Sequence, residues 1–491
     1  MVTNDATIIK VKHETLYEVA KAAFAGTLED EKHNIPYRMI PGPKAKYRCC
    51  IYKEREVIRE RINLACGGYT GEEDNGLVVQ VIPSACEGCP ISRYVVTDNC
   101  QNCMGKACIS SCKFGAISIG RDRTYIDPSK CKECGMCAKA CPYNAIADLV
   151  RPCKRNCPVD AITMDDDGIC VIDKNKCIEC GKCIHSCPFG AIMSRTFIVD
   201  VIREIVAGKR VVAMLAPSTE GQFGADITMQ SWREALKKAG FDDMYEVGLG
   251  GDMTAYAEAK EWAEAYEQGK KMTTSCCPAF YNMVRNFFPE LLDNVSSTLS
   301  PMGCVSRMLK QEDPDVVTVF IGPCIAKKSE VLKGRMEGNA DYALTYGEIR
   351  AILKAKNVKL EPAENINQQA SVFGKRFGNG GGVADAVLES MKEMGIDTSR
   401  MNVEICDGAE ECKKALLLLK NGKLPSDFIE GMACQGGCVG GPSRHTDINQ
   451  AKRARDILIS QADGRSIEEN LHTYNIEHIS MHKDRRPLEG N

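Results

Sequence analysis

The chain of 491 residues lacks a charge excess, a long apolar run and an apolar leader. Lys and Arg number 63 against 66 Asp and Glu, and this balance gives no support to nucleic-acid or membrane-surface binding. No stretch approaches the roughly 20 apolar residues that span a bilayer. The polar N-terminus has neither the apolar core nor the cleavage site of a signal peptide. We therefore expect a cytoplasmic protein with no nucleic-acid or membrane partner.

Cysteine, in contrast, is abundant, with 28 residues in the chain. A disulfide-stabilised secreted scaffold would be short and would carry a signal peptide, and this sequence fits neither condition. The remaining composition, 44% hydrophobic and 26% charged, is that of an ordinary globular protein. We therefore expect the cysteines to be thiolates that hold metal in a reducing compartment.

Cysteine density divides the chain into an N-terminal region (1–95), a cysteine-rich middle (96–196) and a C-terminal domain (197–491). The middle repeats one unit twice: a cysteine pair, a short strand, a charged turn, a second strand and a CxxCxxCxxxCP run. Such a repeat predicts two α+β modules of the bacterial ferredoxin type in tandem.

The C-terminal domain alternates apolar strand runs with amphipathic helices. Residues 211–217 and 315–324 read as buried strands, whereas 227–240 and 346–357 read as helices. Buried strands that alternate with helices predict an α/β domain of parallel βα units.

The CxxCxxCxxxCP run is typical of bacterial ferredoxins, in which three of its cysteines hold one [4Fe–4S] cluster and the fourth serves the neighbouring cluster. A lone CxxC pair could instead belong to a zinc site. Two complete runs, each followed by proline, favour iron and sulfur. The crossing rule predicts three ligand sets: Cys100, Cys103, Cys108 and Cys141; Cys112, Cys131, Cys134 and Cys137; and Cys157, Cys177, Cys180 and Cys183.

The sequence leaves two alternatives for a fourth cluster. Cys153 and Cys187 would serve it, but the second repeat lacks the other two ligands. Either that cluster is absent, or N-terminal cysteines complete it, with Cys86 and Cys89 as the best candidates and Cys66 as a further one. The alternative for these N-terminal cysteines is that they are buried free thiols.

The C-terminal domain holds five further thiols on three separate loops, TTSCCPAF, GPCIAKKSE and GMACQGGCVGGP. Glycine and proline beside these cysteines permit close backbone approach to a bulky group. The three segments resemble the TSCCP, PCxxKxxE and MACxxGCxxGG motifs of the [FeFe]-hydrogenase catalytic domain. The resemblance covers roughly residues 197–450, and departures such as Gly322 before Pro-Cys indicate a divergent branch.

The resemblance implies an H-cluster, a [4Fe–4S] cube joined to a di-iron unit that carries CO, cyanide and a bridging azadithiolate. The implied ligands of the cube are Cys277, Cys324, Cys434 and Cys438, of which Cys438 bridges to the di-iron unit.

Further residues take their roles from the same resemblance. Cys276 matches the thiol that passes protons to the bridging amine, and Lys327 and Ser218 match hydrogen-bond donors to cyanide. Ser218 follows Pro217 in a turn beside the di-iron unit, and Met432 matches a methionine near the bridging CO. On its own, Lys327 could merely pair with Glu330 at helical spacing.

A proton route is implied through Glu261, Ser296, Glu258 and Cys276. The two glutamates are three residues apart, which places both carboxylates on one face of a helix. Carboxylates and thiols can each accept and donate a proton. The alternative is that both glutamates are ordinary solvent-facing residues.

The expected function is reversible reduction of protons to H2, with electrons from a ferredoxin-type carrier and with hydrogenase maturation factors needed for assembly. Two alternatives are a slow sensory hydrogenase and an iron–sulfur scaffold that lacks the di-iron unit. Exposed lysines beside the cluster loops could dock an acidic carrier, or could be ordinary surface residues.

Overall fold

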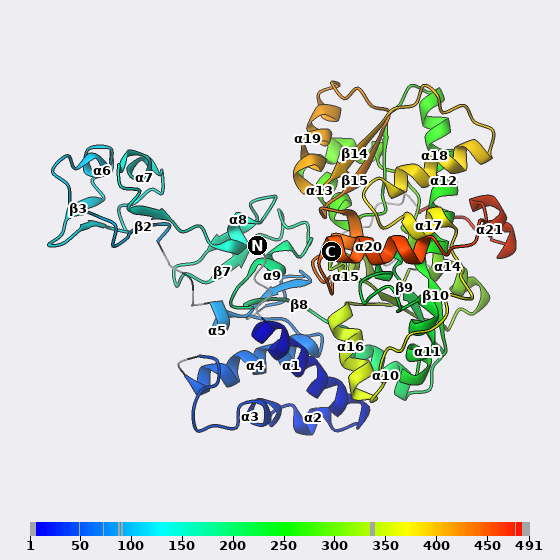
Figure 1. Ribbon diagram of the computed structural model, residues 1–491, viewed down its shortest axis with the longest axis horizontal. Helices are drawn as coiled ribbons and strands as arrows, with labels where there is room; N and C mark the ends of the chain where they lie inside the picture. The colour runs from blue at the N-terminus through cyan, green and yellow to red at the C-terminus, as the bar shows by residue number, and fades with distance from the viewer. Residues whose placement is uncertain are drawn as a thin grey trace.

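The computed structural model describes residues 6–483, except 49, 72, 87–88, 90–91, 334–338 and 477. A large C-terminal body lies at the right of Figure 1, N-terminal helices lie below it, and a small module projects to the left. No helix within the described residues combines the length and apolarity needed to cross a bilayer.

Two parallel sheets form the C-terminal body. The first has the order β10-β9-β12-β13, with strands Asp243–Glu246, Val211–Leu215, Val317–Ile321 and Tyr342–Leu344. The second has the order β11-β15-β14, with strands Met272–Thr273, Phe428–Met432 and Val403–Asp407. All five strand pairings are parallel, and β9, β12 and β15 are buried along their whole length. The predicted parallel βα organisation is therefore confirmed.

Helices surround these sheets (Figure 1). The predicted helix at 227–240 is α11 (Met229–Ala239), which begins at a Thr228 capping box and ends at Gly240 in the left-handed region. The others are α10 (Ile198–Val206), α12 (Val247–Glu267), α13 (Pro278–Phe287), α14 (Pro301–Glu312), α15 (Ala326–Lys333), α16 (Tyr346–Ala355), α17 (Val372–Arg376), α18 (Gly382–Glu393), α19 (Ala409–Lys420), α20 (Ile448–Ile459) and α21 (Ile467–Thr473), with 3-10 turns η1 (Pro217–Thr219), η2 (Pro289–Asn294) and η3 (Gly437–Gly440).

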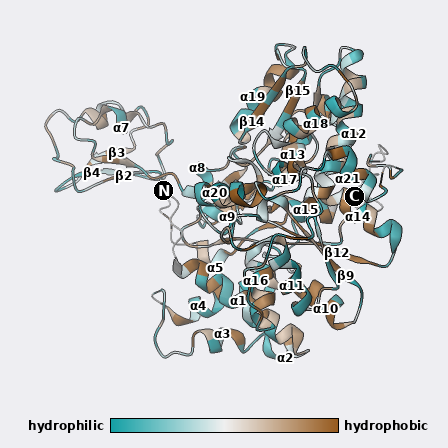
Figure 2. Cartoon of the chain, turned by 45° about the vertical axis from the view of Figure 1, so that its right-hand side comes forward, coloured by the Kyte–Doolittle hydropathy of each residue, from teal (hydrophilic) through white to brown (hydrophobic). Residues whose placement is uncertain are grey.

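The N-terminal region is packed onto this body. Helix α1 (Ala6–Phe24) contacts α4 (Ile51–Ala65), and it also contacts α10 and α16 of the C-terminal domain. One hydrophobic core runs through all of these helices, and Figure 2 shows their apolar residues. The shorter helices of this region are α2 (Leu28–Glu31), α3 (Ile35–Met39) and α5 (Pro83–Cys86).

The first ferredoxin-like module pairs its terminal strands with each other. Strand β2 (Tyr94–Val96) pairs antiparallel with β5 (Ile146–Asp148), and β3 (Ile117–Ile119) pairs with β4 (Thr124–Ile126) as the predicted hairpin. Its two short helices are α6 (Ala107–Ser110) and α7 (Met136–Ala140).

The second module has the same pattern of strands. Its first and last strands lie before and after the first module in the sequence. Strand β1 (Val79–Val81) pairs with β8 (Ile192–Ser194), and β6 (Ile162–Met164) pairs with β7 (Cys170–Ile172). Its helices α8 (Pro152–Arg155) and α9 (Lys182–Ser186) match α6 and α7. The two modules are therefore nested, and the sequence-based boundary at residue 95 does not coincide with the start of the second module.

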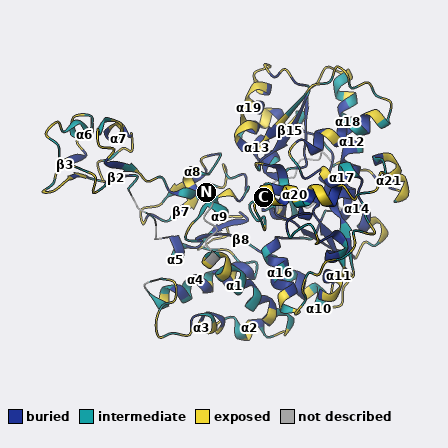
Figure 3. Cartoon of the chain, in the orientation of Figure 1, coloured by how far each residue is buried: buried dark blue, intermediate teal, exposed yellow. Residues whose placement is uncertain are grey.

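The nested module is structurally self-contained. Its buried residues form a small hydrophobic core of their own, whereas the second module shares the large core of the body. It leaves the second module after Cys89 and returns before Cys153. Figure 3 shows that much of its surface is exposed, in contrast to the buried strands of the body.

Candidate active site

The site lies where parallel strands of both sheets end. Cys276 and Cys277 follow β11, Cys324 follows β12, and Cys434 follows β15. Open α/β sheets bind their ligands at the carboxyl ends of their strands. Cys438 joins them from η3 (Gly437–Gly440), the turn that follows β15.

Burial governs the chemistry of these thiols. Burial raises the pKa of Cys324 to about 12 and that of Cys438 to about 11, and it raises the pKa of Cys434 far above its ordinary value. The Cys277 thiol is near enough to raise the pKa of all three, so the four thiols lie close together. Metal cations stabilise thiolates that burial would otherwise keep protonated.

The chemistry of this donor set suits an iron–sulfur cluster. Four thiolates hold a [4Fe–4S] cube, one at each of its iron corners. The donor set and its burial therefore fit a [4Fe–4S] cube.

The turn after β9 borders this set. Ser218 is fully buried, and its hydroxyl lies near the Tyr346 hydroxyl without a hydrogen bond of good geometry within the described part of the chain. Glycine allows backbone to approach this turn closely: a Cβ at Gly378 would lie 3.3 Å from Ser218 Cβ, and one at Gly322 would lie 2.9 Å from Ala216 Cβ. Pro217 begins the turn, so the Ser218 hydroxyl is held in place and available to a bound group.

Lys327 is buried on the other side of the cysteines. Its ammonium donates to Glu330 at 2.6 Å and reaches the Cys276 carbonyl oxygen at 3.4 Å. Burial would lower the pKa of Lys327, but the Glu330 carboxylate and the nearby thiolates outweigh burial and raise it. The pairing with Glu330 that the sequence offered as an alternative is present, and it keeps the cation beside Cys276.

Glu258 is the buried carboxyl of the site, on α12. It is fully enclosed, Oε1 accepts from the Ser275 N–H at 3.3 Å, and Oε2 has no partner of good geometry among the described residues. Burial raises the pKa of Glu258 to about 8, although hydrogen bonds from Ser275 and Ser296 oppose the rise. A carboxyl with a pKa near neutral pH can both donate and accept a proton.

Glu261 lies on the same face of α12 and is half-buried. Its Oε2 accepts from the Ser296 hydroxyl at 2.8 Å, and its two oxygens accept from the Ser297 N–H at 2.9 and 3.1 Å. The Ser296 hydroxyl donates to Glu261 and also lies near Glu258, whose pKa it lowers, so Ser296 stands between the two carboxyls. The geometry brings together the three residues that the sequence grouped.

Cys276 lies at the inner end of this row. It is buried, and burial raises its pKa well above the ordinary value, with the Glu258 charge as the next cause. Met432, the last residue of β15, is buried in the same hydrophobic cluster as Cys276. An apolar surrounding of this kind excludes water from the inner end of the row.

Sequence reasoning missed a set of buried charges behind the turn after β9. The Lys375 ammonium donates to Glu220 at 2.7 Å and to Glu246 at 3.3 Å. The Arg455 guanidinium donates to the carbonyl oxygens of Pro217 and Lys375, so it ties the turn to α17. Their one signal in the sequence was charge within otherwise apolar segments.

Glu430 is a second residue that was missed. It lies inside the buried strand β15, and it accepts from the Gly381 and Ala384 N–H groups at 2.8 Å each. Burial raises the pKa of Glu430 to about 7. A charged residue in the buried run FIEGM could have signalled this anchor for the glycine-rich segment before α18.

The third predicted ligand set lies against the site. Burial raises the pKa of Cys177 to about 12 and that of Cys180 to about 11, with the other cysteines of the set among their neighbours. Cys180 also neighbours Cys277 and Cys434. Asn286 on α13 donates to the Cys177 carbonyl oxygen at 3.3 Å, so the helix that follows Cys277 holds this loop.

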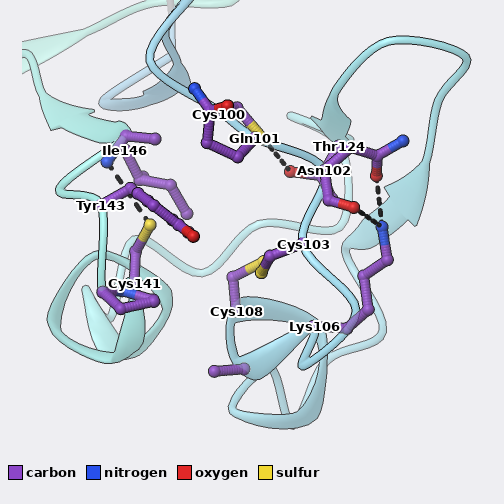
Figure 4. Close-up of a pocket in the computed structure, with 13 residues that line it drawn as sticks. Cys100, Gln101, Asn102, Cys103, Lys106, Cys108, Thr124, Cys141, Tyr143 and Ile146 are labelled. Atoms are coloured by element: carbon purple, nitrogen blue, oxygen red, sulfur yellow. Dashed lines mark hydrogen bonds between the residues drawn. The ribbon is translucent and has the colours of Figure 1, made fainter.

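The first two predicted sets each line one pocket of the nested module. Figure 4 shows the first, with thiols from opposite sides directed inward. Gly135, at the start of α7, belongs to the second pocket, and Tyr94 closes that pocket. The sets are Cys100, Cys103, Cys108 and Cys141, and Cys112, Cys131, Cys134 and Cys137.

The nested topology also gathers a fourth set. Burial raises the pKa values of Cys86 and Cys89, and the Cys153 and Cys187 thiols are near enough to add to the rise at both. Cys86 and Cys89 follow β1 just as Cys100 and Cys103 follow β2. Cys66 does not join them, because the charged groups that act on it are Glu29, Lys32, Arg203 and Asp200.

Cys170 lies beside this fourth set without belonging to it. Its N–H donates to Cys86 Sγ at 3.3 Å, and its thiol hydrogen-bonds to Cys153. Thr124 takes the matching place in the nested module, where its backbone N–H hydrogen-bonds to Cys100, the counterpart of Cys86. The same contact pattern in both modules supports a cluster at both places.

Comparison with known proteins places the chain in context. Residues 209–442 match the family of the iron only hydrogenase large subunit, C-terminal domain. Residues 124–147 match a 4Fe-4S binding domain, and 146–198 match the LdpA Fe-S cluster-binding domain.

Individual relatives extend this result. The chain is 32% identical over 373 residues to iron hydrogenase 1 of Clostridium pasteurianum, a match that covers 64% of each chain and thus just under two thirds of that relative. It is 22% identical to a probable cytosolic Fe-S cluster assembly factor of Brugia malayi, over 40% of this chain and 55% of that one. A solved structure of an [FeFe]-hydrogenase from Chlamydomonas reinhardtii aligns with a TM-score of 0.48 and 20% identity, covering 58% of this chain and 94% of that chain.

Proposed function

Because this chain is a divergent [FeFe]-hydrogenase-like protein, we propose that it catalyses the reversible reduction of protons to H2. The observation that carries the proposal is the row Glu261, Ser296, Glu258 and Cys276, which ends beside the four partly buried cysteines. A site that only held an iron–sulfur cluster would need neither an enclosed carboxyl with a pKa near neutral pH nor a protonated thiol next to a cluster ligand.

The bound group would be an H-cluster held by Cys277, Cys324, Cys434 and Cys438. When bound, it would supply the redox metal at which protons and electrons combine. The chain itself supplies enclosure, a lysine cation beside Cys276 and the buried Ser218 hydroxyl. Assembly of such a group would require hydrogenase maturation factors.

Protons would pass along the row by exchange between neighbouring groups. Glu261 is the half-buried outer member, and Ser296, whose hydroxyl donates to Glu261, lies between it and Glu258. Glu258 would then exchange a proton with Cys276 in a space without bulk water. Carboxyl and thiol groups can bind and release a proton, and a hydroxyl can relay one.

Electrons would arrive through four accessory [4Fe–4S] clusters, one more than the three that the sequence assigned. The fourth set, Cys86, Cys89, Cys153 and Cys187, is completed by the nesting of the two modules. A ferredoxin-type carrier is the expected donor or acceptor, since ferredoxin-like modules serve one-electron transfer.

A second candidate function is that of an iron–sulfur scaffold without the di-iron unit, favoured by the similarity to the assembly factor of Brugia malayi. A slow sensory hydrogenase is a related alternative. The enclosed Glu258 and the buried Ser218 hydroxyl weigh against a scaffold, because a site with only a cube would gain nothing from either group.

The test uses the full chain, matured with the di-iron unit under anaerobic conditions and supplied with reduced methyl viologen. Rapid H2 evolution, together with infrared bands of bound CO and cyanide, is the expected result. Infrared bands with very slow evolution would favour a sensory role. Complete iron and sulfide content with neither bands nor H2 would favour the scaffold and overturn the proposal.

A further inference from the structure

The C-terminal segment, residues 480–483, lies beside the outer part of the proton row. It is beyond the region that matches the hydrogenase family. The Leu299 N–H donates to the Met481 carbonyl oxygen at 2.7 Å, and Thr298 faces His482 in an isolated antiparallel bridge. The segment is therefore paired, as a short added strand, with the stretch of chain that follows Ser296.

This same stretch holds Glu261, the outer carboxyl of the row. The Glu261 carboxylate accepts from three successive residues: from the Ser296 hydroxyl at 2.8 Å, from the Ser297 N–H at 2.9 Å and from the Thr298 hydroxyl at 3.3 Å. A side chain of the C-terminal segment that contacts one of these three residues is thus one residue away from Glu261.

Contacts on both sides of His482 fix the segment in place. The Arg307 guanidinium, on α14, donates to the carbonyl oxygen of Ser480 at 2.6 Å and to that of His482 at 2.9 Å. Met481 is buried in the same hydrophobic cluster as Cys276. The position of His482 is therefore set by the fold, although its own side chain is exposed.

Lys483 extends from the segment toward the inner part of the row. Its ammonium lies 5.3 Å from the ring centre of Tyr281, on the helix that follows Cys277. Burial lowers the pKa of Lys483, whereas the nearby Glu330 and Glu258 carboxylates oppose the shift. One short segment thus directs an amine to the inner part of the row and an imidazole to its outer part.

His482 lies between solvent and the group of residues that holds Glu261. Its Nδ1 is 2.9 Å from the Ser297 hydroxyl oxygen. The N–H of the same serine donates to both Glu261 oxygens, at 2.9 and 3.1 Å. An imidazole can take up a proton at one ring nitrogen and release one from the other near neutral pH.

We propose that His482 exchanges protons between solvent and the row, through the Ser297 hydroxyl and Glu261. The inference rests on the proposed function, because it names the outermost member of that row. In the inward direction, solvent gives a proton to Nε2, Nδ1 gives its proton to the Ser297 oxygen, and the serine gives its hydroxyl proton to the Glu261 carboxylate. One proton has then moved inward, the imidazole and the serine are neutral, and no electron has moved.

The first measurement needs neither the di-iron unit nor turnover. The full, cluster-loaded chain is mixed with D2O, at a temperature that resolves the response of the parent. Time-resolved infrared spectroscopy follows the C=O band of the protonated Glu258 carboxyl, assigned by its loss in Glu258→Gln, as a deuteron replaces the proton. His482→Asn can keep a hydrogen bond to Ser297 but cannot carry a proton, so we expect it to slow this band shift about three- to tenfold.

The second measurement is H2 evolution by the matured chain from reduced methyl viologen. His482→Asn and His482→Ala should each lower the rate about three- to tenfold. Added imidazole should restore His482→Ala, in which the place of the ring is empty, but not His482→Asn. The matched control is His478→Asn, which replaces an exposed imidazole four positions earlier and should leave the band shift and the rate unchanged.

Unfolding temperature and iron content verify that each variant keeps its fold and its clusters. A band shift as fast in both His482 variants as in His478→Asn would overturn the inference. A loss of H2 evolution in His482→Ala that imidazole does not restore would also overturn it, since a structural role would then suffice. A parent that evolves no H2 would contradict the proposed function, while the band shift would still decide the role of His482.

Discussion

Replacement of Glu258 by Gln tests both the burial and the role of this carboxyl. The folded chain keeps the carboxyl protonated up to a pH of about 8, whereas the ordinary value is 4.5. The unfolded state therefore loses its proton first, and the free energy of unfolding falls as pH rises between these values, by about 1.4 kcal/mol per pH unit. At a pH of about 7 the cost is about 3 kcal/mol. Glu258→Gln cannot ionise, so it removes this cost.

We expect Glu258→Gln to unfold at a higher temperature than the parent near pH 8 and at a similar temperature near pH 4.5, with all scans at one rate. H2 evolution should fall about 10²–10⁴-fold, because an amide cannot pass a proton between Ser296 and Cys276. Glu267→Gln, an exposed position on α12, is the control and should change neither property. Turnover within about twofold of the parent would remove Glu258 from the route, and a pH-independent gap in unfolding temperature would refute its burial as a neutral acid.

Four other substitutions, one of them a control, address the clusters and the inner end of the proton row. Cys276→Ala should leave iron content and infrared bands intact and abolish turnover, and retained turnover would exclude this thiol from the relay. Cys89→Ala should lower iron content by up to about four per chain, whereas Cys66→Ala should not; equal losses would refute the fourth set. Cys170→Ala removes the thiol that hydrogen-bonds to Cys153, so an electron-paramagnetic-resonance redox titration should find one accessory cluster at a more negative potential, and an unchanged set of potentials would count against this contact.

Local patterns predicted much of the catalytic fold. The apolar runs at 211–217 and 315–324 became β9 and β12, and the amphipathic segments at 227–240 and 346–357 became α11 and α16. Each depends on periodicity, a cap or a glycine stop within its own segment. The pairing of β1 with β8 could not be predicted, because three-residue strands more than a hundred positions apart carry no local mark of their partner.

The site residues also fall into two groups, those that local spacing predicts and those that only the tertiary structure brings together. Spacing alone grouped the cysteines of each ferredoxin run, because three thiolates on one loop are local. The fourth set needed the nested topology before Cys86 and Cys89 could be joined to Cys153. Glu430 and Arg455 escaped notice because their roles depend on burial and on backbone groups from distant segments.

The most direct test of the central claim is isotope exchange between D2 and water, followed by mass spectrometry on the matured chain. Exchange needs a site that splits H2 and a residue row that trades protons with solvent, but it needs no electron carrier. We predict that the parent forms HD and H2 from D2 in H2O, and that Cys276→Ala forms neither. A parent chain with complete iron content and infrared bands of CO and cyanide that shows no exchange would contradict the account.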